Sequence, residues 1–543
     1  GETILNVLLP GLTNSTVHPR YYAFFSWVFK LASDAKIKVG KPLVAHVFRY
    51  DTVLIYAAQA MHGEDIYRVV GIKSVREGPH KWLGASRKYS ISRDQWQLNR
   101  VSAFSSPYYR PSFERLRLLL VEADGTIVLR PEGQILADAF ERQLSSRAAA
   151  ALSKLGSNRV SGHVLRQLHD DFCPCGVRQM SRGDRSSLIE VLFRRERPSP
   201  DPAQAEQERA RRLSLAFVLH LVKECGSDVW DGDSLRTLIY YWQSPSRAYF
   251  PAPQLRRTAE AWRVFQAQQY ERYAIETLWA SFVRIVARDI VVSFDLAKVS
   301  TQVISHLKEQ RYYQNRGLRF ARDLATTSLG EFSSAVLNAI KTRSNPRAPD
   351  FIEESWQKFR STAAFSEAAW VAEIKNALWT IGNPYQAFGA AVGLLAVLCL
   401  RWAGYRPTAS GSEFLRVGGQ LRLSLGKVIA DFESRRDEPL NRVFSWILEE
   451  YVIGQHLRVA AQKLATEGID TFWFSATEDG YRLHPERNPS DARPTYSGTK
   501  IIAARSCLYD LGLIDSSRNS TYRCTNEGRN LLNAVLKSSV AAS

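Results

Sequence analysis

The residues best suited to holding a metal ion surround Cys173 and Cys175, which are separated by a single proline. Further possible ligands close by are His163, His169, Asp170 and Asp171. Structural zinc sites in proteins usually combine a C-x2-C pair with a second ligand pair at a recognisable spacing, and the sequence offers no such second pair. We therefore expect packing thiols at these cysteines, with no metal site and no cofactor.

Acidic residues for nuclease chemistry would have to hold a hard cation close to the scissile phosphate. Asp228, Asp231 and Asp233 surround Trp230, but no recognisable strand framework positions them. The sequence also contains no phosphate-binding G-x-x-x-x-G-K-S/T loop, no dinucleotide-binding G-x-G-x-x-G and no G-x-S-x-G motif. We therefore assign no catalytic residue, although an enzyme such as a nuclease with a non-local active site remains an alternative.

Two basic clusters are candidates for binding phosphate, because the planar guanidinium of arginine can bond two phosphate oxygens. The first cluster consists of Arg194, Arg195 and Arg197, followed by Arg209, Arg211 and Arg212. It fits a solvated helix face equally well, because acidic residues interrupt it. The second cluster consists of Lys500, Arg505, Arg518 and Arg523, and we add Asn519 to it.

The second cluster lies in a segment with a clear order of elements. A helix begins at Thr499, with Ile502, Leu508 and Leu511 among its apolar residues, and ends at Gly512. Two short strands flank a polar turn at 515–520, and a last helix opens at Asn526. This order resembles the winged-helix domains of bacterial transcription regulators. Lys500 and Arg505 would then lie on a recognition helix of a helix-turn-helix, with Arg518, Asn519 and Arg523 on the wing.

The segment 116–144 repeats this order, with a turn at Asp124-Gly125 and a helix opened by Pro131. Helical patterning dominates between the two segments. We therefore predict a mainly α, multi-domain protein with a C-terminal winged helix and a second winged-helix-like segment near residues 75–145. The expected divisions are an N-terminal helical domain, a helical connector, two helical domains and the winged helix, at 1–145, 146–200, 203–345, 350–485 and 490–543.

The composition favours an anionic partner and a reducing compartment. The formal net charge is +18, which increases affinity for polyanions such as nucleic acid. Six scattered cysteines in 543 residues do not form a disulfide framework, and Gly1 to Leu9 does not resemble a signal peptide. The apolar run Ala387 to Leu400 is too short for a membrane span and contains small residues suited to close helix packing. We expect a cytoplasmic protein without a membrane partner.

One block near the N-terminus is similar to a known group of proteins. The residues N-V-L-L-P-G-L-T-N-S-T and R-Y-Y-A-F-F-S-W, between Asn6 and Trp27, resemble the opening of poorly characterised bacterial proteins encoded near restriction and anti-phage genes. The segment Phe172 to Cys175 resembles a cysteine-containing stretch of the same proteins. The resemblance covers far less than half of the chain, and it implies a role in bacterial defence without naming a catalytic residue.

These observations leave two main hypotheses. The first is a non-catalytic subunit of a bacterial multi-protein system that binds nucleic acid, in particular duplex DNA, beside an ATPase or nuclease partner. The second is a kleisin-like helical scaffold whose winged-helix modules dock partner proteins.

Overall fold

The computed structural model resolves the chain into two compact units, each discontinuous in sequence. Unit 1 comprises Gly1–Ile4, Gly232–Phe250 and Ala259–Ser497, and unit 2 comprises Leu5–Asp231, Pro251–Thr258 and Gly498–Ser543. The structure describes residues 2–37, 39–62, 69–71, 87–91, 102–104, 108–155, 158–178, 183–194, 199–226, 232–244, 247–289, 293–342, 366–403, 423–478, 480–496, 500–516 and 521–540. The five divisions expected from the sequence remain a prediction.

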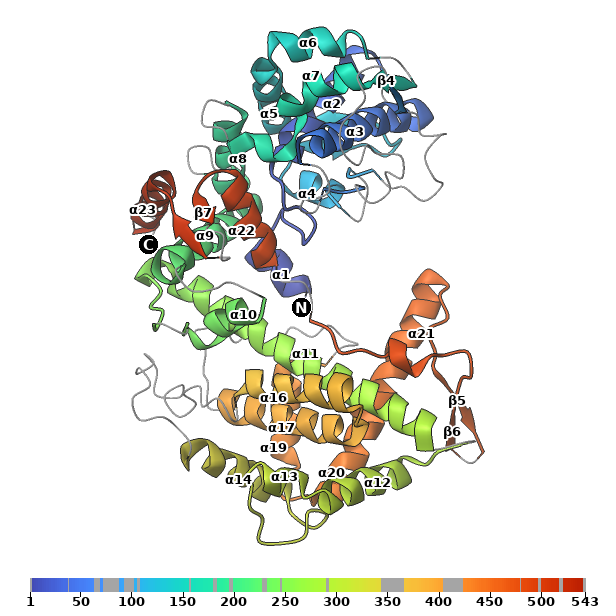
Figure 1. Ribbon diagram of the computed structural model, residues 1–543. Coiled ribbons are helices and arrows are strands. Elements are labelled where there is room, and N and C mark those ends of the chain that lie inside the picture. Colours follow the sequence, from blue (N-terminus) through green and yellow to red (C-terminus); the bar gives the residue numbers. More distant parts are fainter. Residues whose placement is uncertain are drawn as a thin grey trace. The chain divides into compact units, whose positions relative to one another are not determined.

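Unit 2 contains the C-terminal end of the sequence and is mainly helical (Figure 1). Its helices are α1 (Glu2–Leu8), α2 (Arg20–Asp34), α3 (Gly40–His62), α4 (Arg110–Arg115), α5 (Pro131–Gln143), α6 (Ser146–Leu152), α7 (Gly162–Phe172), η3 (Pro174–Arg178), α8 (Asp184–Phe193), α9 (Pro202–Cys225), η4 (Pro253–Leu255), α22 (Lys500–Asp510) and α23 (Asn526–Val540). Its strands form three antiparallel pairs: β1 (Lys88–Ser90) with β4 (Arg159–Ser161), β2 (Leu119–Val121) with β3 (Ile127–Leu129), and β7 (Ile514–Ser516) with β8 (Tyr522–Cys524). Helix α1 begins in the segment Gly1–Ile4 of unit 1 and continues into unit 2.

The aromatic helix α2 is the centre of the core of unit 2. Its residues from Arg20 to Phe29 are all buried, because apolar and aromatic side chains occupy every side of the helix. Phe24 and Trp27 contact the rings of Phe140 in α5 and Phe172 in α7. These aromatic residues therefore serve packing in the core.

Unit 1 is a helical assembly with one described hairpin (Figure 1). Its helices are α10 (Gly232–Tyr241), α11 (Arg256–Asp289), α12 (Leu296–Glu309), α13 (Tyr312–Asn315), α14 (Leu329–Thr342), α16 (Glu367–Lys375), η5 (Asn376–Ile381), α17 (Pro384–Trp402), α19 (Leu425–Ser434), α20 (Leu440–Trp446), η6 (Ile447–Gly454), α21 (Gln455–Glu467) and η7 (Pro489–Asp491). The hairpin pairs β5 (Phe474–Thr477) with β6 (Gly480–Leu483).

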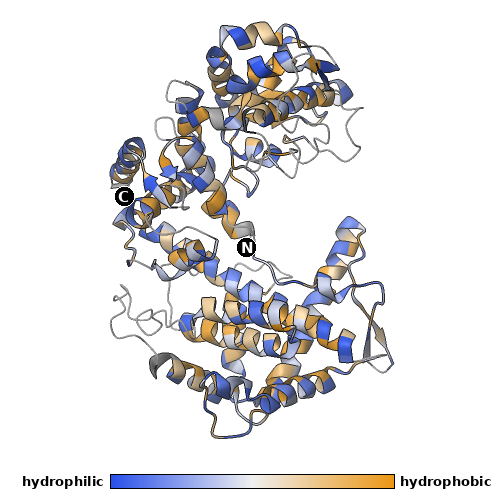
Figure 2. Ribbon diagram, viewed as in Figure 1, coloured by the Kyte–Doolittle hydropathy of each residue, from blue (hydrophilic) through white to orange (hydrophobic). Residues whose placement is uncertain are grey.

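Helix α17 forms the core of unit 1. Its glycines allow neighbours to pack against its backbone, since a Cβ at Gly389 would meet Leu307 of α12 and one at Gly393 would meet the ring of Trp370 of α16. Much of α17 is hydrophobic in Figure 2. It is the one helix of the described residues long and apolar enough to cross a membrane, and most of it is buried in the unit. The prediction of a buried core helix is confirmed.

An ion pair inside unit 1 links α16 to α17. Nε of Arg401 donates to a carboxylate oxygen of Glu367 at 2.6 Å, and both side chains are at most 2% exposed. The hydroxyls of Tyr240 and Tyr241 donate to the same carboxylate at 2.7 and 2.6 Å. Because every charge in this cluster has a partner, we interpret it as structural.

Candidate nucleic-acid interface

The C-terminal segment folds in the expected order of helix, hairpin and helix. Gly512 ends α22 with φ +66°, a conformation that glycine adopts without strain. The backbone N–H of Thr525 donates to the carbonyl of Leu513 at 3.1 Å, which brings the start of α23 against the hairpin. A Cβ at Gly528 would lie 2.1 Å from that same carbonyl, so the close approach requires a glycine.

The N-terminal segment repeats this geometry position by position. The backbone N–H of Arg130 donates to the carbonyl of Leu118 at 3.0 Å, and a Cβ at Gly133 would lie 2.1 Å from that oxygen. The spacing from Leu118 to Gly133 equals the spacing from Leu513 to Gly528, and the strand registers correspond throughout. The repeat noticed in the sequence is therefore also a repeat of backbone geometry.

Helix α8 and the residue that follows it each provide an arginine to one of the two modules. At one end, Arg185 donates to the carboxylate of Glu527 at 2.5 Å and to the carbonyl of Leu511 at 2.6 Å. At the other end, Arg194 donates to Glu132 at 2.8 Å. Glu132 and Glu527 occupy equivalent positions, one residue before the buried glycine of each module. The two ion pairs tie both modules to α8.

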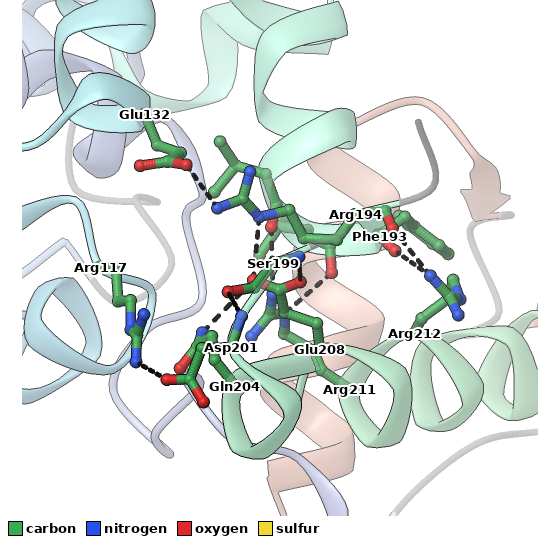
Figure 3. A network of polar contacts seen from close by, with 12 residues as sticks. Arg117, Glu132, Phe193, Arg194, Ser199, Asp201, Gln204, Glu208, Arg211 and Arg212 are labelled. Atoms are coloured by element: carbon green, nitrogen blue, oxygen red, sulfur yellow. Dashed lines mark hydrogen bonds and ion pairs between the residues drawn. The ribbon is translucent and has the colours of Figure 1, made fainter. Parts of the chain in front are cut away.

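Three arginines of the first basic cluster, Arg194, Arg211 and Arg212, are engaged inside unit 2 (Figure 3), whereas Arg209 is exposed. The guanidinium of Arg194 lies between Glu132 and Glu208, and its side chain is 8% exposed. Arg211 is buried and donates to the carbonyls of Val191 and Leu192 at the end of α8, where cations interact favourably with the helix dipole. Burial lowers the pKa of Arg211 to about 10.

These positions change the role we assign to the cluster. The predicted phosphate contact by Arg194 is corrected to a structural contact, because two carboxylates occupy its buried guanidinium. Arg212 also donates to a carbonyl near the end of α8, that of Arg194 itself, at 2.7 Å. Arg195 and Arg197 lie outside the described residues, so their assignment stays a prediction.

The proposed recognition helix α22 is covered by its own chain. The thiol of Cys507 contacts the carbonyl of Thr16 at 3.2 Å, and the carboxylate of Asp510 lies 2.7 Å from Nδ1 of His18. Most residues of α22 are buried, and the remainder are only partly exposed. A recognition helix must present an open face to the major groove. The expectation that α22 enters the groove is therefore not supported by its surroundings.

Lys500 illustrates the same correction at a single residue. Its ammonium donates to Asn6 at 2.8 Å and to the carbonyls of Leu5 and Leu9 at 3.4 Å, and the residue is 4% exposed. Lysine is favourable near these carbonyls because they belong to the end of α1 and the residue that follows it. Lys500 therefore leaves the set of candidate phosphate contacts.

The other predicted residues of the C-terminal module have mixed positions. Arg505 is partly exposed, and its guanidinium lies over the ring of Tyr522 at 4.7 Å. Arg523 has a side chain that is 83% exposed, with Asp515 at 3.6 Å. Arg518 and Asn519 lie outside the described residues. Of the two described and accessible arginines, Arg523 has the more open side chain.

A second exposed basic surface lies at β1, β4, α6 and α7 of unit 2, where α6, α7 and β4 lie together in Figure 1. We call it the basic rim. Its members are Arg87, Lys88, Arg147, Lys154 and Arg159, which are exposed, and Arg166, which is partly exposed. Among the residues described by the structure, none of these six forms an ion pair. They are therefore free to meet an anion.

The strand pairing places two rim residues on one face. Lys88 pairs with Ser161, and Arg159 pairs with Ser90, so Lys88 and Arg159 are diagonal neighbours on the same side of the ribbon. Tyr89 and Val160 point to the opposite side and are buried. The buried side fixes the register, and the register directs both cations outward.

One feature of the sequence indicates this rim, although the rim residues are not clustered along the chain. From Arg142 to His169 the chain has five arginines and lysines and no aspartate or glutamate. The charges are spread over three helices, a strand and a loop rather than adjacent in sequence, so they do not look like a basic patch. Their lack of acidic neighbours is the informative feature.

The candidate residues for catalysis and metal binding that the structure describes are not brought together. Cys173 is buried after α7, and its carbonyl accepts a hydrogen bond from Arg20, while the side chain of Cys175 lies outside the described part of the chain. Asp233 pairs with Arg236 and Lys375, and Asp228 and Asp231 are outside the described residues. Within the described residues, no group of three potential ligands could hold a metal ion.

An open hollow of about 480 Å³ lies along α12 in unit 1. Among the described residues we consider it as a candidate active site. His306 stacks on Tyr385 with ring centres 4.4 Å apart, and the Tyr385 hydroxyl donates to Asp289 at 2.6 Å. Burial lowers the pKa of His306, which keeps its ring neutral at pH 7. Asn383 lies 3.2 Å from Nε2 of His306. Thr301 and Ser305 also line the hollow. We assign no reaction to this group, because within the described residues neither hydroxyl is hydrogen-bonded to His306, and that of Thr301 donates to the carbonyl of Ala297.

Comparison with protein-family models, with curated proteins and with solved structures found no match.

Proposed function

We propose that this protein binds duplex DNA through the basic rim of unit 2, as a non-catalytic component of a larger system. The observation that carries the proposal is the set of exposed and partly exposed cations without ion-pair partners among the described residues, four of which lie in a stretch free of acidic residues. Such cations release counterions from the DNA backbone when they contact phosphates. By contrast, Arg194 and Lys500 are already engaged within the fold.

The experiment compares two variants with the same net charge. The rim variant carries Lys88→Gln, Arg147→Gln, Lys154→Gln and Arg159→Gln. The control variant carries Arg110→Gln, Lys223→Gln, Lys308→Gln and Lys427→Gln, whose cations are exposed but paired with neighbouring carboxylates. Each variant loses four positive charges. The rim variant should lose affinity for a duplex DNA probe, whereas the control should bind nearly as the parent does.

The wider setting is also part of the proposal. The resemblance of the block from Asn6 to Trp27 supports membership of a bacterial defence system, in the cytoplasm, with an ATPase or a nuclease as partner. A tagged parent protein expressed in its native host should co-purify with such a partner. Recovery of the chain alone, under conditions that preserve complexes, would contradict this part.

A docking scaffold is the second candidate, and the first module supports it. The outward cross-strand pair of its hairpin is Leu120 with Val128, which are 43% and 41% exposed. At the equivalent positions of the second module, Asp515 pairs with Arg523. An apolar pair on an exposed hairpin suits a protein partner. Val128→Glu should abolish co-purification of that partner while leaving affinity for DNA unchanged.

A further inference from the structure

An exposed tryptophan in unit 1 lies beside two arginines that form no ion pair among the described residues. Trp379, near the end of η5, is 47% exposed. The guanidinium carbons of Arg284 in α11 and Arg493, after η7, lie 4.7 and 5.7 Å from the centre of a Trp379 ring. Beside the tryptophan, Ile381 is 54% exposed. These four residues form what we call the Trp379 platform.

The backbone holds the platform in place. Segment η5 is a π-helical turn, a feature that often occurs at functional sites. It ends at Gly382, with φ +69°, and the amide of Asn383 donates to the carbonyl of Ala377 at 2.8 Å. The side chain of Asn383 then caps α17 by accepting from the backbone N–H groups of Tyr385 and Gln386. The exposed ring therefore projects from a turn anchored on both sides by helices.

The charge of the platform is unbalanced. Arg284 donates only long hydrogen bonds, of 3.4 and 3.5 Å, to two carbonyls, and Arg493 donates to the carbonyl of Ser490 at 2.8 Å. Burial, and after it the positive charge of Arg493, lowers the pKa of Arg284. The buried Arg211 donates shorter hydrogen bonds to carbonyls, of 2.8 and 3.2 Å, whereas the buried Arg401 and Arg194 each have a carboxylate partner. Two neighbouring cations without one indicate a site for an external anion.

We propose that the Trp379 platform binds single-stranded nucleic acid, with an unpaired base against the tryptophan and the backbone phosphates against the two arginines. An exposed aromatic ring offers a stacking surface to any base, and guanidinium planes can stack on bases or bond phosphate. A flat ring joined to positive charge suits this ligand better than an apolar peptide, which would leave the charges unmatched. This inference goes beyond duplex binding at the basic rim, because it uses different residues in a different unit.

The test uses the full chain and a fluorescein-labelled oligo(dT) single strand of about 20 nucleotides, longer than typical single-strand site sizes. Trp379→Ala should weaken binding by roughly 5- to 150-fold, the range expected for the loss of one stacked base. Arg493→Gln should weaken binding at low salt and reduce the salt slope by about 0.7. Trp379→Phe keeps an aromatic face and should retain most of the affinity.

Phe250→Ala provides the matched control. Phe250 is an exposed aromatic residue of the same unit, at 54%, and no described arginine or lysine lies over its ring. The Phe250→Ala variant should bind oligo(dT) with the affinity of the parent protein. Unchanged affinity in Trp379→Ala, or equal losses in Trp379→Ala and Phe250→Ala, would overturn the inference. Duplex binding by the Trp379 variants should match that of the parent, so failure here and failure of the rim proposal can be told apart.

Discussion

Alanine at the two equivalent glycines should loosen the two modules separately. A Cβ at Gly528 would lie 2.1 Å from the carbonyl oxygen of Leu513, and a Cβ at Gly133 would lie 2.1 Å from that of Leu118. Ordinary contact requires the helix to move by about 1 Å, which is overpacking at a cost of about 1–3 kcal/mol. The movement also weakens one backbone hydrogen bond, worth about 1 kcal/mol.

The gain in helix propensity offsets part of that cost. Alanine is favoured over glycine within a helix by up to about 1 kcal/mol, so we expect Gly528→Ala to cost about 1–3 kcal/mol in net local stability. A chain with two units need not unfold in one step, and a single melting temperature would report poorly on one module. Hydrogen exchange of the amide of Thr525, which donates to Leu513, is the appropriate local measurement.

That amide should exchange roughly 5- to 150-fold faster in Gly528→Ala, and the amide of Arg130 should respond in the same way to Gly133→Ala. Gly232→Ala is the control, because its new Cβ would meet only the end of the Arg236 side chain, at 3.4 Å. In the Gly232→Ala variant, the amides around residue 232 should exchange at an unchanged or slower rate. Unaltered protection of Thr525 in Gly528→Ala would refute the reasoning from close approach.

Three further changes test other parts of the structure. Arg401→Met leaves the carboxylate of Glu367 buried without its partner and should lower unfolding stability by about 3–5 kcal/mol in urea titrations; a loss below about 1 kcal/mol would contradict the network. Lys500→Met should cost about 1–3 kcal/mol, because it removes a buried donor, yet leave DNA affinity intact; weakened DNA binding in a folded variant would restore Lys500 as a contact. Burial raises the pKa of Glu271 from 4.5 to about 8, so its contribution to stability is greatest below pH 4.5 and declines as the pH rises toward 8. Glu271→Gln should flatten this part of the stability profile, and an identical profile in parent and variant would show that Glu271 does not titrate there.

Local chemistry made the C-terminal module predictable. Gly512 and the opening of α23 at Asn526 are choices made within a few residues, and both lie where the sequence placed them. Of the expected turn at 515–520, the first two residues belong to β7 and the others lie outside the described residues. The apolar residues of the predicted helix differ in burial: Leu508 and Leu511 are buried, as is Leu531 of α23, whereas Ile502 is partly exposed. The helical pattern alone does not say which neighbour covers which side of the helix.

Contacts between distant residues could not be read from the sequence. The burial of α22 depends on Thr16 and His18, which lie nearly the whole chain away from Cys507 and Asp510. Arg194 looked like a surface charge because Glu132 is remote in sequence. A count of charges in the sequence does not separate paired from unpaired groups. For this reason Arg194 was predicted to contact phosphate, and Arg159 was not.

The most direct test of the central claim is the dependence of duplex DNA affinity on salt concentration for the parent, the rim variant and the control variant. In a plot of log K against log salt, each phosphate contact contributes about 0.9 to the slope. Because four cations are removed, the slope of the rim variant should be smaller than that of the parent by up to about 3.6. The variant should also lose most of its affinity for DNA at low salt. The control variant should keep the slope of the parent. Equal slopes for all three proteins, or equal losses in both variants, would contradict the claim that the basic rim contacts DNA.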